Sequence, residues 1–322
     1  FLKARGKTTK PLCFLIGTNW PHVPWPDKFE GYEPEKVPAA PGNVDTPVSR
    51  EWRARYAAAV TRADNDLGLV LNAVQEVLGE STLIAFTSDH GSQWPFGKWN
   101  CYEGGVRVPL LVSWPGVIKP ASRTTALVSW VDLLPTLLSA AGGKPSDDID
   151  GRSFLPVLRG TSDSHRDAIY TTHSGDGNWN VYPQRAVRVG KWKYIRNLHP
   201  EFAFTSHVDL ADPVGKQSYF DSWRDAAKND PKAAEVIRHY NQRSAEELFD
   251  LEADPFEQHN LAGDPNASAE LSRLRKQLDD WMGAQGDKQT VFGKPRLLSD
   301  PASYGPDAPG GDGKARKRPN RK

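Results

Sequence analysis

Cysteine, methionine and long apolar runs are scarce in this chain, and these shortages exclude several classes of protein. Only two cysteines occur among 322 residues, too few for a disulfide framework, and they leave the redox compartment open. No run of about eighteen apolar residues is present, so the sequence predicts no membrane span. Neither sign of charge is in large excess, because 41 Lys and Arg residues balance 40 Asp and Glu residues to a net charge of +1. A hydrophobic content of 38% still predicts a mostly globular protein.

The stretch from Thr87 to Gly105 carries the strongest chemical signal. It follows an apolar β-branched run, residues 82–86, that predicts a buried strand. Asp89 and His90 therefore come at the carboxyl end of a strand, where open α/β sheets bind their ligands, and Lys98 follows in a loop rich in Gly and Pro. Together these groups suit a metal-assisted reaction on an anion. The tripeptide Asp-His-Gly alone favours a simpler interpretation, a turn in which Asp accepts backbone N–H groups.

Further motifs follow one order along the chain. They are Asn19-Trp20-Pro21-His22, Ser88-Asp89-His90-Gly91, Gly97-Lys98, Tyr102-Glu103-Gly104-Gly105 continuing to Pro109, Val131 to Leu137, and Glu247 to Leu251 with Asp254-Pro255 and Asn260-Leu261-Ala262. Over residues 11–285 this set resembles the type I sulfatases of the alkaline phosphatase superfamily. Within that family the loop from Trp94 to Tyr102, with the segments 183–188 and 194–198, is most similar to the heparan N-sulfatases, which have Arg where this chain has Lys98.

The resemblance implies a fold and a domain organisation. The expected fold class is α/β: an alkaline phosphatase-like mixed-sheet sandwich domain, incomplete in this chain, followed by a small α+β C-terminal subdomain. Residues 1–145 would form the C-terminal part of the catalytic domain and residues 146–165 a connector. Residues 166–290 would form the α+β subdomain, and residues 291–322 a disordered basic tail.

The resemblance also implies roles for individual residues. Asp89 and His90 would supply two of four ligands to a divalent metal, usually Ca²⁺. Lys98 would bind the sulfate and neutralise charge that develops on the bridging atom, and His22 would contact the sulfate or the leaving group. Two alternatives stay open. His90 could instead hydrogen-bond a sulfate oxygen, since calcium prefers oxygen ligands, and His22 could cap an apolar strand at residues 12–18. Asn19 replaces the first His of the family's His-x-Pro-His element.

The nucleophile of the family is not found in this sequence. Type I sulfatases use a formylglycine made from a Cys-x-Pro/Ala-x-Arg motif, and neither Cys13 nor Cys101 has an Arg at that spacing. Cys13 is predicted to be a small core residue of the strand at 12–18. Thr46-Pro47 is better interpreted as a helix start than as a remnant of the motif. We therefore expect the formylglycine and the early Asp-Asp pair in an N-terminal part outside this chain, and no activity from the chain alone.

The whole enzyme is then expected to be a sulfuric ester or sulfamate hydrolase acting on a sulfated saccharide, with heparan-type N-sulfoglucosamine favoured. Two alternatives remain: a phosphodiesterase or phosphonate hydrolase of the same superfamily, or a non-catalytic glycan-binding remnant. The resemblance implies a periplasmic or secreted location and is compatible with a homodimer. The last ten residues, Gly313 to Lys322, hold six Lys and Arg residues, which predicts a solvated tail. Attraction to polyanions is the alternative, but no aromatic residues are interleaved to indicate specific nucleic-acid binding.

Local patterns predict the remaining elements. Helices are expected at residues 48–79, 129–142 and 268–281 and around 218–228 and 232–246, and strands at 82–88, 108–113, 186–189, 193–195 and 247–251. Thr46 should cap the first helix, and Ser129 the second with Asp132 as its capping-box partner. Further candidates for substrate contact, which fit structural roles equally well, are His173, Arg185, Arg188 and Asn197.

Overall fold

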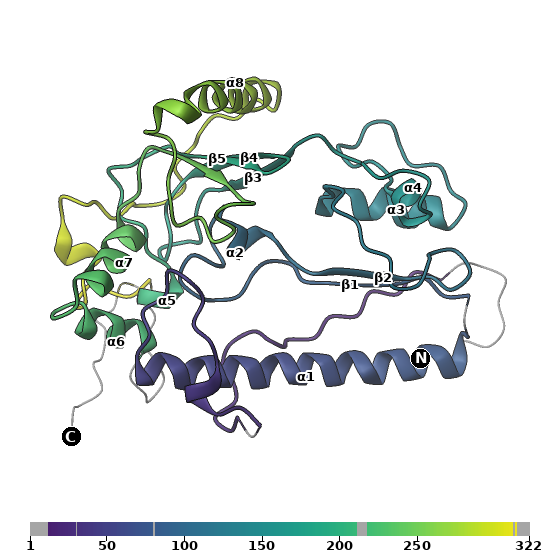
Figure 1. Ribbon diagram of the computed structural model, residues 1–322, viewed down its shortest axis with the longest axis horizontal. Helices are drawn as coiled ribbons and strands as arrows, with labels where there is room; N and C mark the ends of the chain where they lie inside the picture. The colour runs from purple at the N-terminus through teal and green to yellow at the C-terminus, as the bar shows by residue number, and fades with distance from the viewer. Residues whose placement is uncertain (1–11, 30, 80, 211–217, 312, 314–322) are drawn as a thin grey trace. The chain divides into compact units, whose positions relative to one another are not determined.

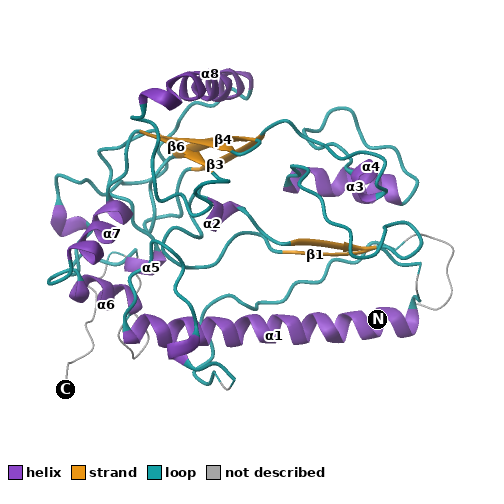
Figure 2. Ribbon diagram, viewed as in Figure 1, coloured by secondary structure: helices purple, strands orange, loops and turns teal. Residues whose placement is uncertain are grey.

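The computed structural model describes residues 12–29, 31–79, 81–210, 218–311 and 313. Helices and two β-sheets alternate along these residues (Figures 1 and 2). The chain divides into two compact units: unit 1 takes residues 1–20, 61–89 and 109–169, and unit 2 takes residues 21–60, 90–108 and 170–322. No helix among the described residues is both long enough and apolar enough to cross a membrane.

The long helix α1 (Pro47–Val77) contributes its first turns to unit 2 and the remainder to unit 1. Its start follows from the local sequence. Thr46 Oγ1 accepts a hydrogen bond from the Ser49 N–H at 3.0 Å, and Ser49 Oγ accepts one from the Thr46 N–H at 2.8 Å. These two bonds satisfy backbone donors that a helix start leaves unpaired, and Pro47 has no N–H to satisfy. The predicted cap and helix are confirmed.

Unit 1 contains a two-stranded antiparallel sheet of β1 (Ile84–Thr87) and β2 (Leu110–Ser113). The 3₁₀ turn η2 (Trp130–Asp132), α3 (Leu133–Ala140) and α4 (Leu155–Leu158) follow. The predicted capping box of Ser129 and Asp132 is present. The buried Asp132 carboxylate accepts hydrogen bonds from the Ser129 N–H at 2.9 Å, the Arg152 N–H at 2.8 Å and Arg166 Nε at 2.7 Å. It joins three segments of the unit.

Unit 1 leaves much of its apolar surface accessible. Among the described residues, the buried apolar side chains of this unit are Ala63, Pro135, Phe154 and Leu155. By contrast, Leu111 on β2 is 63% exposed and Leu134 on α3 is 68% exposed. We call the accessible large side chains the apolar surface of unit 1; they are Phe14, Leu15, Ile16, Leu69, Leu71, Leu111, Trp130, Val131, Leu134, Leu138 and Ile149.

The predicted strand at residues 12–18 is wrong. The described segment has no regular secondary structure, and Cys13 is exposed rather than part of a core. The segment has the apolar composition of a strand, but composition alone does not form one. A strand also needs a partner strand that pairs with its N–H and C=O groups.

Unit 2 is built around a four-stranded sheet in the order β3 (Ile169–His173), β4 (Gln184–Val189), β5 (Trp192–Asn197) and β6 (Glu246–Asp250). β4 and β5 form the predicted hairpin, whose turn places Gly190 at φ +56°. β6 pairs antiparallel with β5. Figure 2 shows α8 (Ser268–Ala284) lying along this sheet, and its Leu274 and Leu278 side chains are fully buried.

Shorter elements complete unit 2. They are η1 (Pro34–Lys36), α2 (Glu103–Val106), α5 (His207–Leu210), α6 (Tyr219–Ala226), α7 (Pro231–Asn241), η3 (Pro265–Ala267) and η4 (Pro301–Ser303). The largest buried side chains among the described residues gather in this unit and include Trp223, Tyr194 and Tyr240. The chain's core therefore lies in the unit that also carries Lys98.

The predicted disorder of residues 291–322 is wrong for its first part. Residues 291–311 are described and pack against unit 2: the Ala203 N–H donates to the Arg296 carbonyl at 2.8 Å, and Ala308 is fully buried. The six basic residues of the tail fall in 314–322, outside the described residues. The remaining domain boundaries, at residues 145 and 165, stay a prediction.

Candidate functional site

The loop that carries Lys98, residues 90–108, is folded tightly on itself. The Gly91 N–H donates to the Gly105 carbonyl at 2.8 Å. A Cβ at Gly91 would lie 1.8 Å from the Gly104 carbonyl oxygen, and a Cβ at Gly105 would lie 2.4 Å from the Gly97 carbonyl oxygen. Backbone meets backbone at both places, so only glycine fits. The glycines of the sulfatase-like motifs are therefore explained by close approach within this loop.

Two bulky residues in this loop adopt backbone conformations that side chains rarely take. Phe96 has φ 63° and Trp99 has φ 67°, and they flank Gly97 and Lys98 on either side. Each such residue costs on the order of 1–2 kcal/mol and persists only where its surroundings determine the conformation, as they often do at functional sites. The Lys98 N–H donates to the Ser92 carbonyl at 2.9 Å. The backbone at Lys98 is thus held in one conformation.

Asn100 and Arg243 hold this conformation through hydrogen bonds. Asn100 Nδ2 donates to the Gly97 carbonyl at 3.2 Å and to the Lys98 carbonyl at 3.3 Å. Its Oδ1 accepts from the guanidinium of Arg243, which is 3% exposed and lies 3.8 Å from the ring centre of Phe204. Sequence reasoning missed Arg243, because its partners are far away along the chain and no local pattern marks it.

The motif residues Tyr102 and Glu103 connect the loop to the sheet of unit 2. Tyr102 donates from its hydroxyl to Glu247 Oε1 at 2.7 Å. Glu103 Oε1 lies 3.1 Å from Lys193 Nζ, and the Glu103 N–H donates to Glu257 Oε2 at 2.6 Å. Burial raises the pKa of Glu257, against the opposing charge of Lys193. These buried bonds give Tyr102 and Glu103 structural roles that do not require contact with a ligand.

The two predicted catalytic residues, Lys98 and His22, both belong to unit 2, and the charges of both act on a third residue, His207. Lys98 is partly buried, with Nζ 4.9 Å from the ring centre of Trp99. His22 is exposed, with Nδ1 2.6 Å from the Val23 carbonyl oxygen. Burial is the main cause that lowers the pKa of a third residue, His207, and the charges of Lys98 and His22 lower it further. The catalytic roles of Lys98 and His22 stay predictions.

The two predicted metal ligands are adjacent in sequence, and Asp89 belongs to unit 1 whereas His90 belongs to unit 2. Asp89 is exposed and accepts from Ser88 Oγ at 3.5 Å, and His90 Nδ1 lies 2.8 Å from the Gly91 carbonyl oxygen. Across the described part of the chain, no three His, Cys, Asp or Glu side chains are grouped so that they could hold a metal ion. Calcium takes six to eight oxygen ligands. The described residues therefore do not fit a complete calcium site, and the ligand roles of Asp89 and His90 stay predictions.

His207 was not predicted, and it occupies an aromatic stack beside Lys98. Its ring centre lies 4.8 Å from that of Trp99 and 4.3 Å from that of Trp179, with interplanar angles of 15° and 24°. Asp176 Oδ2 accepts from Trp99 Nε1 at 2.7 Å and lies 3.6 Å from His207 Nδ1. No sequence motif surrounds His207, so the stack could be found only from the structure.

The four further candidates for substrate contact are all held by partners within unit 2. The pairs are His173 with Asn180 at 2.7 Å, Arg185 with Asp287, Arg188 with Glu103 at 2.8 Å, and Asn197 with Glu247 at 3.0 Å. These contacts support the structural interpretation that the sequence left open.

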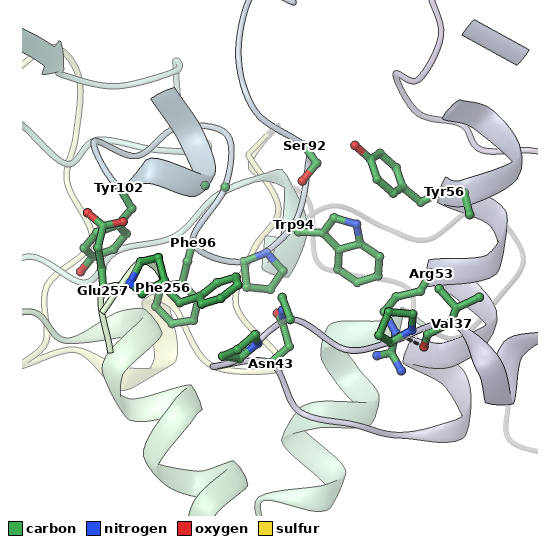
Figure 3. Close-up of a pocket in the computed structure, with 18 of the residues that line it drawn as sticks. Val37, Asn43, Arg53, Tyr56, Ser92, Trp94, Phe96, Tyr102, Phe256 and Glu257 are labelled. Atoms are coloured by element: carbon green, nitrogen blue, oxygen red, sulfur yellow. Dashed lines mark hydrogen bonds between the residues drawn. The ribbon is translucent and has the colours of Figure 1, made fainter. Parts of the chain in front are cut away.

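A cavity of about 510 Å³ also lies within unit 2 (Figure 3). It is bounded by residues 37–43, the start of α1, residues 94–97 of the Lys98 loop and residues 255–258. In Figure 3 Trp94 lies between Tyr56 and Phe96. Lys98, His22 and His207 are not among the lining residues, and the walls are mainly apolar. The cavity is therefore mainly apolar and separate from the basic side chains of Lys98, His22 and His207.

Comparisons with known proteins identify the family. The Sulfatase family model matches residues 1–143, and a model described as N-sulphoglucosamine sulphohydrolase, C-terminal, matches residues 90–225. An ulvan-active sulfatase of Formosa agariphila is 32% identical over 286 residues, which are 86% of this chain and 53% of that protein. The chain belongs to the sulfatase family. The sulfatase of human origin named N-sulphoglucosamine sulphohydrolase is 32% identical over 264 residues, or 78% of this chain and 52% of that protein.

The family assignment extends to the fold. This sulfatase chain matches a structure solved in complex with its substrate D-glucosamine-2-N,6-O-disulfate, with a TM-score of 0.55, 24% identity and coverage of 77% of this chain and 44% of that chain. A phosphonate monoester hydrolase of Agrobacterium radiobacter matches with a TM-score of 0.50, 21% identity and coverage of 79% and 44%. The predicted alkaline phosphatase-like α/β fold is confirmed. The chain spans about half the length of the curated sulfatases that it matches.

Proposed function

We propose that this chain carries the sulfate-binding part of an enzyme that hydrolyses sulfate esters or sulfamates of sugars. The observation that supports this most directly is the conformation of the Lys98 loop. Two residues at positive φ and a buried hydrogen-bond relay fix the backbone at Lys98, and His22 and His207 lie in its electrostatic neighbourhood. An ammonium group carried on a fixed backbone suits an oxyanion, because it can stabilise charge that develops on the bridging atom.

Heparan-type N-sulfoglucosamine is the favoured substrate within this class. The family model for the C-terminal part of N-sulphoglucosamine sulphohydrolases matches residues 90–225, which include Lys98 and His207. The human relative of that name and the structure with bound glucosamine disulfate support the same sugar. The ulvan-active relative indicates that other sulfated polysaccharides occur among similar proteins. A sulfated saccharide is therefore the partner we assign to the site, and export to the periplasm or medium is the location we infer from the family.

Neither cysteine of the chain suits the role of nucleophile. Cys13 is exposed but lacks the family's Cys-x-Pro/Ala-x-Arg motif. Cys101 is buried, and burial raises the pKa of its thiol to about 11, so the thiolate is disfavoured. We infer that the formylglycine and the remaining metal ligands come from sequence outside this chain, and that this chain alone binds without turnover.

Binding by calorimetry tests the proposal directly. We expect the chain to bind N-sulfoglucosamine, and unsulfated glucosamine to show no measurable binding. Lys98→Met should weaken the affinity by about tenfold or more, since it removes a charged hydrogen-bond donor. Lys276→Met, which removes a lysine 76% exposed on α8, should not. Tighter binding of glucosamine 6-phosphate than of N-sulfoglucosamine would favour the alternative of a phosphodiesterase or phosphonate hydrolase. Equal binding of unsulfated glucosamine and N-sulfoglucosamine would contradict the proposal.

Turnover is tested on the longest reading frame that contains this chain. Release of sulfate from N-sulfoglucosamine by that product, and not by the chain alone, is the expected result. Binding without turnover by both would instead support the non-catalytic glycan-binding alternative.

A further inference from the structure

His207 is held rigidly by two tryptophans and one carboxylate. The imidazole stacks on the indoles of Trp99 and Trp179, with ring centres 4.8 Å and 4.3 Å away and interplanar angles of 15° and 24°. Two stacked faces leave the ring little freedom to rotate, so its nitrogens are held in fixed directions. Asp176 fixes the stack further, because the same carboxylate oxygen accepts from Trp99 Nε1 at 2.7 Å.

The two nitrogens of His207 have different surroundings. Nδ1 lies 3.6 Å from Asp176 Oδ2 and is buried, with no hydrogen-bond partner within the described ranges. The side chain nevertheless keeps 28% of its surface accessible. The accessible surface therefore belongs to ring atoms other than Nδ1, which leaves Nε2 as the ring nitrogen that we assign to a ligand. The nearby carboxylate favours the tautomer with its proton on Nδ1, which leaves a lone pair on Nε2.

The charges around His207 come from three other segments. Asp176 favours the imidazolium form, and Lys98 and His22 oppose it. Burial is the largest effect, and the net result is a pKa of His207 below its ordinary value, which favours the neutral ring. Asp209 lies on the same helix as His207, but its carboxylate has other hydrogen-bond donors. Its Oδ1 accepts from the Ser206 N–H at 2.7 Å and from the Tyr240 hydroxyl at 2.8 Å.

We propose that His207 is a third sulfate-binding side chain of this site, which takes up a proton when the sulfate group of a sulfated sugar binds beside Lys98. The inference rests on the proposed function. An oxyanion near Nε2 is repelled by the lone pair of the neutral ring and attracted by the N–H of the imidazolium. Binding therefore draws one proton from solvent to Nε2, which then donates to a sulfate oxygen. The positive charge gained by the ring is offset by the negative charge of the bound sulfate.

Two observable consequences separate this role from a purely structural one. Bound sulfate should raise the pKa of His207 by about one unit or more, as an opposite charge within hydrogen-bond distance does. The affinity of the chain for a sulfated sugar should rise as pH falls through the neutral range, because proton uptake accompanies binding. A histidine that only fills space between Trp99 and Trp179 would produce neither effect.

The experiment is an NMR titration of the whole chain labelled with ¹³C at the histidine Cε1 positions. The His207 signal is assigned by its loss in His207→Gln. The titration from pH 5 to pH 9 is run without ligand, with inorganic sulfate and with glucosamine-2-N-sulfate. Calorimetry at pH 6 and pH 8 compares the unaltered chain with His207→Gln, Lys98→Met and the control His259→Gln, whose histidine is 83% exposed in unit 2. We expect His207→Gln to weaken glucosamine-2-N-sulfate binding about tenfold at pH 6, and the control to change nothing.

The outcomes distinguish this inference from the proposed function. If Lys98→Met abolishes binding while His207→Gln leaves both affinity and its pH dependence unchanged, the inference is overturned and the proposed function stands. A His207 pKa that neither ligand moves also overturns it. If the unaltered chain binds no sulfated sugar, both fail. Should His207→Gln not fold, the pKa measured on the unaltered chain decides the question, with the signal assigned through Asp176→Asn.

Discussion

Arg243 donates a hydrogen bond to Oδ1 of Asn100, and Asn100 donates in turn to the carbonyl oxygens of Gly97 and Lys98. The guanidinium lies over aromatic rings, 3.8 Å from the centre of Phe204, which places its charge in a buried setting. A residue near the end of α7 thus sets the backbone conformation of the loop that carries the predicted sulfate ligand. Arg243 is a positioning residue, since no contact with a ligand is needed for this effect.

Replacing Arg243 with Met should disturb both stability and binding. The substitution leaves the buried Asn100 oxygen without its donor and frees the strained loop, so we expect a loss of roughly 3 kcal/mol in the free energy of unfolding. Affinity for N-sulfoglucosamine should fall as well, by calorimetry on the folded fraction. Arg273→Met, at a 46% exposed site on α8, should change the stability by no more than about 0.5 kcal/mol. A folded Arg243→Met variant with unchanged affinity would show that the relay does not position Lys98.

Gly91→Ala tests the close approach inside the same loop. The added Cβ would lie 1.8 Å from the Gly104 carbonyl oxygen, a contact that only a backbone shift can relieve. We expect a destabilisation of roughly 3 kcal/mol in urea unfolding. The matched change Gly68→Ala in α1 meets nothing within 4 Å and should stabilise by about 0.5–1 kcal/mol, because alanine favours the helix. Equal effects of the two substitutions would contradict the described loop conformation.

Asp132→Asn should destabilise unit 1 in a pH-dependent way. Burial alone raises the pKa of Asp132, but hydrogen bonds from Arg166 and from the Arg152 and Ser129 N–H groups outweigh it and hold the pKa below its ordinary value. A lowered pKa in the folded state means that the carboxylate stabilises the fold above about pH 4, and that this contribution is lost as the pH falls below that value.

The substitution should therefore cost roughly 3 kcal/mol at pH 7, because it breaks a buried charged pair, and distinctly less at pH 3. Urea unfolding at the two pH values measures the difference. Asp163→Asn, at an exposed position of unit 1, serves as the control and should change stability by about 0.5 kcal/mol or less. A cost that is equal at both pH values would mean that the charge of Asp132 is not what holds the three segments together.

Calcium should have little effect on this chain by itself. Within the described residues no three His, Cys, Asp or Glu side chains are grouped so that they could hold a metal ion, and one or two ligands bind the ion weakly. A ligand that binds only the folded chain raises the free energy of unfolding with the logarithm of its concentration relative to Kd, so weak binding adds little. We therefore expect the melting temperature in millimolar calcium and in chelator to agree within about 1 °C. A rise of several degrees would show that a complete site forms within this chain.

The sequence was a reliable guide where one short segment determines its own structure. Thr46 and Ser129 cap helices because their hydroxyl groups reach N–H groups a few residues away, and Gly190 closes a hairpin because it accepts positive φ. The apolar run from Phe14 to Ile16 misled the prediction, since a strand needs a partner strand that local composition does not specify.

The candidate site was predictable only in part for the same reason. The position of Lys98 in a glycine-rich motif indicated an anion ligand, and the loop geometry explains why those glycines are required. Arg243 and His207 act through contacts with Asn100 and Trp99, more than a hundred residues earlier in the chain. Such contacts arise from tertiary packing, and no periodicity or spacing in one sequence encodes them.

The apolar surface of unit 1 has a consequence for how the chain opens and closes in solution. Its large exposed side chains, such as Leu111 and Leu134, gain little from folding, whereas the sheet of unit 2 buries Tyr194 and Leu248 completely. Local opening of unit 1 therefore costs little free energy, and amide protons of β1 and β2 should exchange with solvent much faster than those of β4 and β5. Any chain that covers Leu111 and Leu134 would slow this exchange, so exchange rates in β2 provide a sensitive report of association.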